Sequence, residues 1–366
     1  MLLLLKLKLG CAASKRQVVV AVCLWVLFAG GVWYCSAQSV MQQPPNQGFE
    51  QWSGEATSSP AGWHSYDEAD GIFAGTASNS SGGDAPALQR AAGHTGKNAV
   101  VIRCNKILGI AANGALTCGR VHMGAMTASS DDNYCYTDRD GGYACRFTSR
   151  PDSVSFWAKF KMKGKVTASA KAHLHTDCDF RDFVDIGQSS DIASAIFYFS
   201  DAGNGGWHQY KQAFKAYASP QKATAEQAPM PTVDTWTRRP SYLLFSFTTN
   251  RHVMKGSKGD ALYIDDIRFI YNKRLSQIMI DGEPLPDFSP GCHAYVCRRS
   301  AIGCPQVAAV TESPRATVAV HQPTADNPVA EIVVSHDDVL AGEAQPVIYR
   351  IYFQPVMTER MAQEGE

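Results

Sequence analysis

Short runs of alternating apolar and polar residues, rather than helical repeats, dominate the chain between residues 46 and 271. Clusters of Gly, Asn, Asp, Ser and Pro separate these runs. Such a pattern is typical of an all-β sandwich. It predicts eight strands, at residues 99–104, 115–121, 153–160, 166–175, 192–199, 207–214, 242–248 and 262–271. Eight strands suit a jelly-roll β-sandwich built from two Greek keys.

The run from Leu262 to Tyr271 contains two adjacent carboxylates among apolar side chains. Alternation in an extended strand would place Asp265 on one face and Asp266 on the other. Both faces are mostly apolar, so this strand is predicted to lie deep in the sandwich. Buried carboxylates are costly unless a cation or hydrogen-bond donors receive them. At least one of the two is therefore expected to have a partner.

An early NQGFEQW segment (Asn46–Trp52), a PAGWHSY segment (Pro60–Tyr66) and the late YIDD sequence resemble the jelly-roll carbohydrate-binding modules of secreted bacterial glycan-degrading proteins. The resemblance implies that Glu50 and Asp265 meet at a structural calcium ion, with Asp266 as a second ligand or pointing to a loop. Calcium accepts several carboxylate and carbonyl oxygens in a loose geometry. The alternative is that Glu50 is solvated and Asp265 is hydrogen-bonded to the backbone.

Five motifs make the resemblance more specific: NQGFEQW, PAGWHSY, ANGALTCGRVHMG, RPDSVSFWAKF and YLLFSFTTNRHVMKGSKGDALYIDDIRFIY. Together they resemble the secreted Bacteroidetes family called the "putative carbohydrate metabolism domain". The resemblance covers residues 46–271 and implies a β-sandwich exported by glycan-feeding bacteria. It brings no catalytic residues with it.

Residues 272–355 carry a different pattern of short strands joined by Asp-Gly, Pro-Gly and Asn-Pro turns. This pattern predicts a second, smaller β-sandwich. It resembles the immunoglobulin-like modules that accompany bacterial surface proteins. The expected core residues are Leu275, Ile278, Ile280, Leu285, Phe288 and Tyr295. The jelly-roll domain is accordingly assigned to residues 38–271 and a frayed tail to residues 356–366.

The first 37 residues combine a basic start with the apolar run Val18–Cys35 and the small residues Ser36 and Ala37. These features predict a secretory signal peptide cleaved after Ala37. The protein is then expected to be secreted, periplasmic or on the outer cell surface. The apolar run is also long enough for an uncleaved membrane anchor, which stays an alternative.

Charge and cysteine content narrow the possible functions. The first 37 residues hold four of the 34 basic residues and none of the 34 acidic ones, so the remainder is slightly acidic. A nucleic-acid partner would favour a basic face instead. Eight of the 11 cysteines follow this segment, and in an exported protein they can oxidise. The sequence leaves their pairing open.

The sequence HLHTDCD (His173–Asp179) is the main candidate for chemistry. Alternation would place His173, His175, Asp177 and Asp179 on one strand face. Two imidazoles with a carboxylate can bind zinc or transfer protons. The alternative is a solvated outer face that runs into an acidic loop.

Aromatic residues are the second candidate, because sugars stack on exposed rings beside hydrogen-bonding groups. In Ser153–Phe160 the alternation turns Val154, Phe156, Ala158 and Phe160 toward the core and Trp157 away from it. Further candidate ligand-binding rings are Tyr198, Trp207, Tyr210 and Tyr242. The alternative is that these rings seal the sheet beneath a loop.

Three functions remain. The first is a secreted or cell-surface glycan-binding protein that takes part in polysaccharide utilisation together with other surface proteins, without catalysis. The second is a glycoside hydrolase that uses a carboxylate pair, and the third is a structural adhesion or assembly subunit. A binding module should present an aromatic platform without convergent acids, whereas a hydrolase requires two carboxylates across the sugar.

Overall fold

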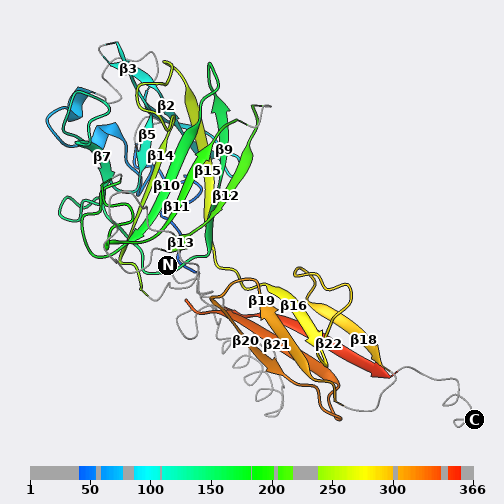
Figure 1. Cartoon of the computed structure of the whole chain (residues 1–366). Coiled ribbons are helices and arrows are strands. Elements are labelled where there is room, and N and C mark those ends of the chain that lie inside the picture. Colours follow the sequence, from blue (N-terminus) through cyan, green and yellow to red (C-terminus); the bar gives the residue numbers. More distant parts are fainter. Residues whose placement is uncertain are drawn as a thin grey trace, which may run out of the picture. The chain divides into compact units, whose positions relative to one another are not determined.

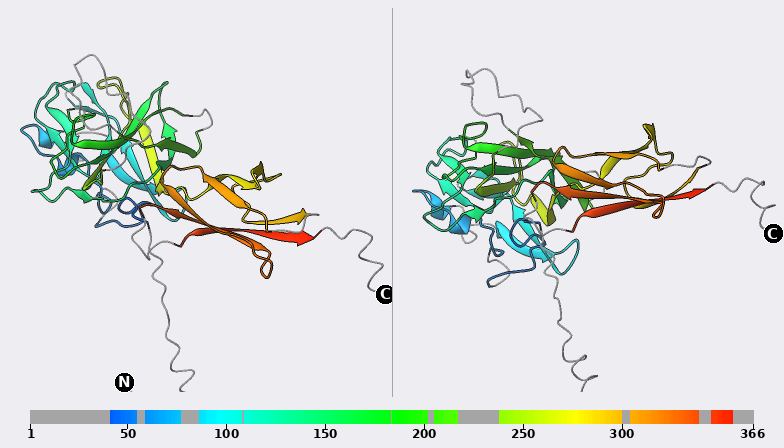
Figure 2. Two further views of the ribbon diagram at one scale, coloured as in Figure 1. Left: turned by 60° about the horizontal axis from the view of Figure 1, so that its bottom comes forward. Right: turned by 90° about the horizontal axis from the view of Figure 1, so that it is seen from below.

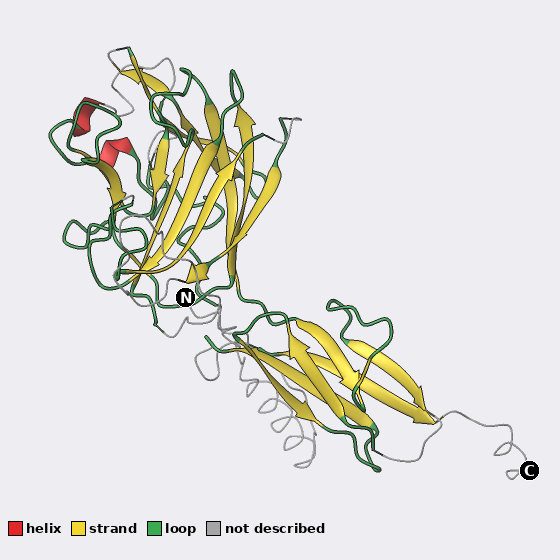
Figure 3. Ribbon diagram, in the orientation of Figure 1, coloured by secondary structure: helices red, strands yellow, loops and turns green. Residues whose placement is uncertain are grey.

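The computed structural model describes residues 41–54, 59–76, 86–107, 109–182, 184–201, 205–216, 238–299, 304–338 and 345–355. The predicted signal peptide and the predicted tail lie outside these ranges. Within them, no helix is both long and apolar enough to cross a membrane. The described helical turns are short 3-10 turns at Tyr66–Glu68 (η1) and Ala74–Thr76 (η2), and the rest of the regular structure is β (Figure 3).

Two antiparallel sheets form the part of the chain before Tyr271 (Figure 1). The β9 sheet has the order β1 (Leu88–Ala92), β2 (Asn98–Arg103), β15 (Ala261–Ile270), β9 (Ser153–Lys161) and β12 (His208–Ala213). The β10 sheet has the order β13 (Lys215–Ala216), β11 (Asp191–Phe199), β10 (Ala168–His175), β14 (Tyr242–Thr248) and β5 (Ala115–Thr117), and β8 (Cys145–Arg146) also pairs with β14. The predicted all-β sandwich is confirmed.

Seven of the eight predicted strands correspond to single strands, but the run at 115–121 is divided. Its first half is β5 and its second half is β6 (Arg120–Met123), which pairs with β7 (Asn133–Tyr136). Gly119 lies at the break, where a Cβ atom would approach the carbonyl oxygen of Tyr136 to 2.2 Å. The short hairpin β3 (Asn105–Ile107) and β4 (Ile110–Ala112) also lies outside the two main sheets.

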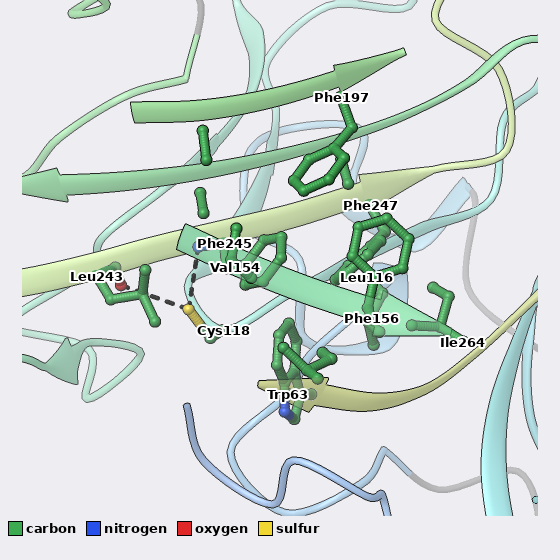
Figure 4. Close-up of a cluster of buried hydrophobic side chains, with 14 of the residues drawn as sticks. Trp63, Leu116, Cys118, Val154, Phe156, Phe197, Leu243, Phe245, Phe247 and Ile264 are labelled. Carbon is green, nitrogen blue, oxygen red and sulfur yellow. Dashed lines mark hydrogen bonds between the residues drawn. The ribbon is translucent and has the colours of Figure 1, made fainter. Parts of the chain in front are cut away.

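Apolar side chains from both sheets meet in one core (Figure 4). The alternation predicted for β9 is confirmed, since Val154, Phe156, Ala158 and Phe160 all belong to this core. On β10 the core residues are Ala168, Ala170, Ala172 and Leu174. Every second residue of β10 therefore faces away from the core.

Strict alternation fails in β15. The register of β15 against β9 shifts between Asp265 and Arg268, and Asp266 has a positive φ of 48°. A bulge of this kind inserts a residue and reverses the facing of those that follow. Ile264 and Ile267 can thus both reach the core, although strict alternation would place residues three apart on opposite faces.

Residues after Tyr271 form separate sheets and a separate core (Figure 2). One sheet has the order β17 (Glu283–Pro284), β16 (Leu275–Ile280) and β19 (Val307–Thr311). The other has the order β18 (Ala294–Arg299), β22 (Val347–Pro355), β21 (Val329–His336) and β20 (Ala316–His321). All six predicted core residues of this region are buried in the second core or packed against it.

Candidate functional site

The outward-facing residues of β10 form a polar row under loops. These residues are Ser169, Lys171, His173 and His175, and all four are buried. Phe180 packs on both imidazoles, with ring centres 5.2 Å from His173 and 4.9 Å from His175. The solvated face considered from the sequence is therefore not what the chain forms, because the segment after β10 folds back over it.

The centre of the polar row is a buried charge cluster. The Lys171 ammonium lies 3.0 Å from the carboxylate of Asp182, and the His173 imidazole lies 3.7 Å from Asp182 and 3.6 Å from Asp191. Ser194 donates a hydrogen bond to Asp191 at 2.9 Å. Buried charges of this kind are tolerated only when they are paired.

The cluster shifts the proton affinities of its members in opposite directions. Burial would raise the pKa of Asp182, but the neighbouring His173 imidazole and the charge of Lys171 lower it to about 2. Burial would lower the pKa of His173, but Asp182 and Asp191 raise it to about 9. At neutral pH His173 is thus an imidazolium and Asp182 a carboxylate.

His175 differs from His173 although only one residue separates them. Its Nε2 lies 2.8 Å from the Thr137 hydroxyl and its Nδ1 lies 2.8 Å from the carbonyl oxygen of Thr176. Burial lowers the pKa of His175 to about 4, so this imidazole is neutral.

Asp177 and Asp179 do not join the two histidines. Both carboxylates bind the Arg139 guanidinium, at 2.9 Å and 2.7 Å, beyond the end of β10. Among the residues that the structure describes, no group of three or more His, Cys, Asp or Glu side chains is arranged to hold a metal ion. The predicted HLHTDCD constellation is therefore not assembled.

A cavity of about 200 Å³ lies over the other end of the polar row. Its lining includes Ser169, Lys171, Ser246 and Thr248 from the sheet, together with Asp182. The rest comes from loops and short elements: Tyr66, Ala111, Ala112, Asn113, Ala115, Val121, His122, Met123, Ala128, Asn133, Tyr134, Cys135, Asn250, Arg251, Val253 and Met254, with Tyr198 of β11. Tyr198, Val253 and Met254 are 56%, 45% and 47% exposed, so the cavity is accessible from the surface.

Rings and hydrogen-bonding groups share the cavity wall. The Arg251 guanidinium lies 4.4 Å from the centre of the Tyr198 ring, in a cation–π contact. His122 bonds to Asp70 through Nδ1 at 2.8 Å and stacks on Tyr134 with ring centres 4.8 Å apart. The cavity can therefore offer a small polar ligand both an aromatic face and charged or amide donors.

The six residues proposed from the sequence as ligand contacts lie on both sheets. Tyr198, Tyr242, His173 and His175 lie on the outer side of the β10 sheet, whereas Trp157 and Trp207 belong to the β9 sheet and the segment beside it. Tyr242 is buried and stacks on His175 with ring centres 5.9 Å apart. Tyr210, the further aromatic candidate, packs against the core. Of the six, Tyr198 is both mostly exposed and part of the cavity wall.

Trp157 faces away from the core, as the alternation predicts, but it is half-buried. Its indole stacks on His94 with ring centres 3.9 Å apart and an interplanar angle of 16°. Trp207 packs edge-on against the same imidazole at 5.7 Å. The Lys159 ammonium lies 5.0 Å from the Trp207 ring centre and 4.6 Å from that of Tyr263. The turn between β1 and β2 thus covers one face of Trp157.

The turn between β1 and β2 also donates hydrogen bonds to the carboxylates for which calcium was predicted. Glu50 accepts hydrogen bonds from the backbone N–H of Lys97 at 2.7 Å and from the side chain of Asn98 at 3.0 Å. A Cβ atom on Gly96, which has a positive φ of 65°, would meet Glu50 at 2.1 Å. Glycine permits both this backbone conformation and this close approach.

Asp265 and Asp266 bind the start of the turn. Asp265 accepts the N–H groups of His94 and Asp266 at 2.7 Å and 2.8 Å. Asp266 contacts the His94 imidazole at 2.8 Å and accepts the Thr95 hydroxyl at 2.7 Å. Burial raises the pKa of Asp265 to about 6. In this arrangement hydrogen-bond donors occupy the positions around the carboxylates where an ion would bind. Calcium at Glu50, Asp265 and Asp266 stays a prediction.

Sequence reasoning missed the cavity residues Lys171, His122 and Arg251. Lys171 carried a usable signal, since a lysine in the middle of a long predicted strand needs a nearby acid if the face is covered. The contact of His122 with Asp70 joins residues 52 apart, which neither periodicity nor spacing reveals.

No family model matches the chain, and no curated protein matches it. Among solved structures, it is similar to a putative glycoside hydrolase from Bacteroides thetaiotaomicron, at 14% identity and a TM-score of 0.43 over 62% of this chain and 70% of that one. It is also similar to a cleaved adhesin domain of Lys-gingipain from Porphyromonas gingivalis, at 10% identity and a TM-score of 0.27 over 58% of this chain and 94% of that one. A carbohydrate-binding module specific for non-crystalline cellulose matches at 10% identity and a TM-score of 0.26, over 57% and 87% of the two chains.

Proposed function

We propose that the chain is a carbohydrate-binding protein and that its ligand binds without catalysis in the cavity at Tyr198. The observation that carries the proposal is the exposed Tyr198 ring beside the Arg251 guanidinium, at the mouth of a cavity with hydroxyl and amide side chains. A sugar ring offers an apolar face to the tyrosine and hydroxyl groups to the polar side chains.

The cavity volume fits a small ligand. About 200 Å³ is less than the roughly 300–1,000 Å³ of pockets for drug-sized molecules. One terminal or branching sugar residue of a larger glycan therefore suits the cavity better than a long internal stretch of the polymer.

The acid chemistry of the cavity favours binding over hydrolysis. Of the described residues that line it, Asp182 is the one carboxylate, and its lowered pKa of about 2 keeps it ionised. A glycoside hydrolase needs a protonated acid and a second carboxylate on opposite sides of the scissile bond. Asp265, with its raised pKa of about 6, is not among the residues that line this cavity.

The cellular setting forms part of the proposal. Membership of the "putative carbohydrate metabolism domain" family, export through the N-terminal segment and cooperation with other surface glycan-utilisation proteins rest on the sequence resemblance. Calcium at Glu50 and Asp265 belongs to the same set of proposals. The second sandwich would then act as a spacer or docking module.

A glycan array probed with the protein, followed by product analysis on each glycan that binds, tests the function. The proposal expects binding to at least one class of oligosaccharide and recovery of that oligosaccharide uncut after long incubation. Cleavage of the bound glycan would establish the hydrolase alternative. Absence of binding to polysaccharides and oligosaccharides alike would favour the structural subunit.

A further inference from the structure

A single segment, Gly119–Ala144, supplies much of the cavity wall. It carries β6 and β7 and contributes Val121, His122, Met123, Ala128, Asn133, Tyr134 and Cys135 to the lining. Cys118 directly precedes this segment and Cys145 directly follows it. The positions of these two cysteines thus determine how firmly the wall is anchored to the sheet.

Both cysteines lie along the same edge of β14. The N–H of Cys118 donates to the carbonyl oxygen of Phe245 at 3.0 Å, and Cys145 is the register partner of Leu243. The two cysteines therefore occupy positions two residues apart along β14. Phe245 and Leu243 both face the core, so side chains placed opposite them face the core as well.

The two thiols are in contact. Both are free thiols in this structure, and the neighbouring Cys145 thiol adds to burial in raising the pKa of Cys118. The Cys118 sulfur also accepts the N–H of Phe245 at 3.1 Å and donates to the carbonyl oxygen of Leu243 at 3.4 Å (Figure 4). Positions two residues apart along a strand are about 6.6 Å apart, which is within the usual Cα separation of about 4.4–6.8 Å in disulfides.

We propose that Cys118 and Cys145 form a disulfide that fastens the two ends of the cavity wall to the β10 sheet. Each thiol loses a proton and together they give up two electrons as the S–S bond forms. The oxidant is a disulfide donor, such as a thiol–disulfide oxidoreductase or glutathione disulfide, whose own S–S bond breaks to give two thiols.

The bond forms while the chain is folding. Burial raises the pKa of the Cys118 thiol well above its usual value in the folded protein, and the thiolate is the form that attacks a disulfide. Exchange is therefore slow once the core has closed around Cys118, which is only 2% exposed. The same burial protects the finished bond from reductants.

Mapping of the cysteines tests the proposal directly. The full chain is refolded in reduced and oxidised glutathione, unfolded without reductant, alkylated, digested and examined by mass spectrometry. The expected result is one linked peptide pair that joins Cys118 to Cys145. Alkylation of both residues, or a link from either one to another cysteine, would overturn the proposal.

Thermal unfolding provides an independent readout. Protein that is unfolded and refolded in reductant should have a Tm roughly 5–10 °C lower than the oxidised protein, because the bond closes the segment between the cysteines in the unfolded chain. Cys145→Ser should abolish this response to reductant, whereas Cys292→Ser, an exposed position in the second sandwich, should keep it in full. A response retained in Cys145→Ser would count against the bond.

Discussion

The outer faces of the two sheets of the first sandwich differ in how they are covered. On the β9 sheet a short turn covers one face of Trp157 through His94, and nearby rings stay half-buried. On the β10 sheet longer segments bury a row of charged side chains and leave a cavity at one end of it. The candidate site therefore lies on the β10 sheet, which carries buried ion pairs. It does not lie on the β9 sheet, which carries Trp157.

The difference shows what a covering loop can provide. The turn that stacks His94 on Trp157 contributes no residue to the lining of the cavity at Tyr198. The segments over β10 contact the sheet through ion pairs such as Lys171–Asp182, which joins the segment after β10 to the sheet. The cavity beneath these segments is accessible from the surface at Tyr198.

The largest effect is expected from Asp182→Asn. This change leaves the Lys171 ammonium and the His173 imidazolium without a carboxylate that both of them contact. Breaking a buried ion pair by removing one partner costs about 3–5 kcal/mol of unfolding free energy. Denaturant unfolding measures this cost.

Asp179→Asn is the matched control for that substitution. Asp179 also contacts a cation, Arg139 at 2.7 Å, but its side chain is 43% exposed. Exposed ion pairs contribute about 0–1 kcal/mol. Equal losses in the two variants would show that the charges over β10 are not buried together.

Acid is expected to have the next largest effect, through His175. Its pKa is about 4 in the folded protein and 6.5 in its usual state, so only the unfolded chain binds a proton between these values. The contribution of His175 to the unfolding free energy should therefore fall by at most roughly 3 kcal/mol as the pH falls from 6.5 to 4. Asp265, whose pKa is raised from 3.8 to about 6, acts in the opposite direction in this window, so the effect of His175 is measured as the difference between the wild type and His175→Gln. Asp182 contributes little in this window, because its pKa is lowered from 3.8 to about 2 and its stabilising effect is lost between those two values.

Because of His173, we expect the unfolding free energy to fall as the pH rises on the alkaline side. With a raised pKa of about 9, the contribution of His173 is complete below pH 6.5 and is lost as the pH rises through 9. Urea unfolding across this pH range measures both slopes. His175→Gln should change the acid slope alone, and an unchanged acid slope in this variant would contradict the assignment.

Trp157→Ala should have a smaller effect on stability. It also tests which sheet, the β9 sheet or the β10 sheet, binds the glycan. The change removes a half-buried stack on His94 and should cost about 1–2 kcal/mol of unfolding free energy. With the binding site at Tyr198, glycan affinity should not change. If Trp157 instead stacks on a sugar, as the sequence predicts, the variant should lose glycan affinity with little loss of stability. Calorimetry on the variant distinguishes these two outcomes.

Calcium is expected to have the smallest effect. If the ion binds at Glu50, Asp265 and Asp266, the turn must give up hydrogen bonds that it now donates to these carboxylates. Much of the binding energy is then offset, and we expect a Tm only slightly higher in calcium than in excess chelator. Identical melting curves would end the calcium prediction.

Much of the fold could be predicted from the sequence because strands repeat every two residues. The core face of β9 followed from that period. In β16, Leu275 and Ile278 both belong to the second core although they are three residues apart, because the register shifts between Leu275 and Gln277. The bulge in β15 did not follow from that period either, since its inserted residue depends on how the Asp265 and Asp266 side chains bond to a turn about 170 residues earlier.

The candidate site was harder to predict than the core. Alternation correctly turned His173 and Trp157 away from the core, but it carries no information on which loops cover a sheet. His173 is fully buried between Asp182, from the segment that follows β10, and Asp191, at the start of β11. Of the rings chosen from the sequence, Tyr198 reached the cavity only because β11 pairs with β10.

Titration calorimetry with Tyr198→Ala tests the central claim most directly, using an oligosaccharide identified on the array. Tyr352→Ala is the matched control, since Tyr352 is a 39% exposed tyrosine on β22 of the second sandwich. We predict a roughly 5–150-fold loss of affinity for Tyr198→Ala, by analogy with aromatic stacking on other rings, and no change for the control. Unchanged affinity in a folded Tyr198→Ala variant would contradict the assignment of the cavity as the carbohydrate site.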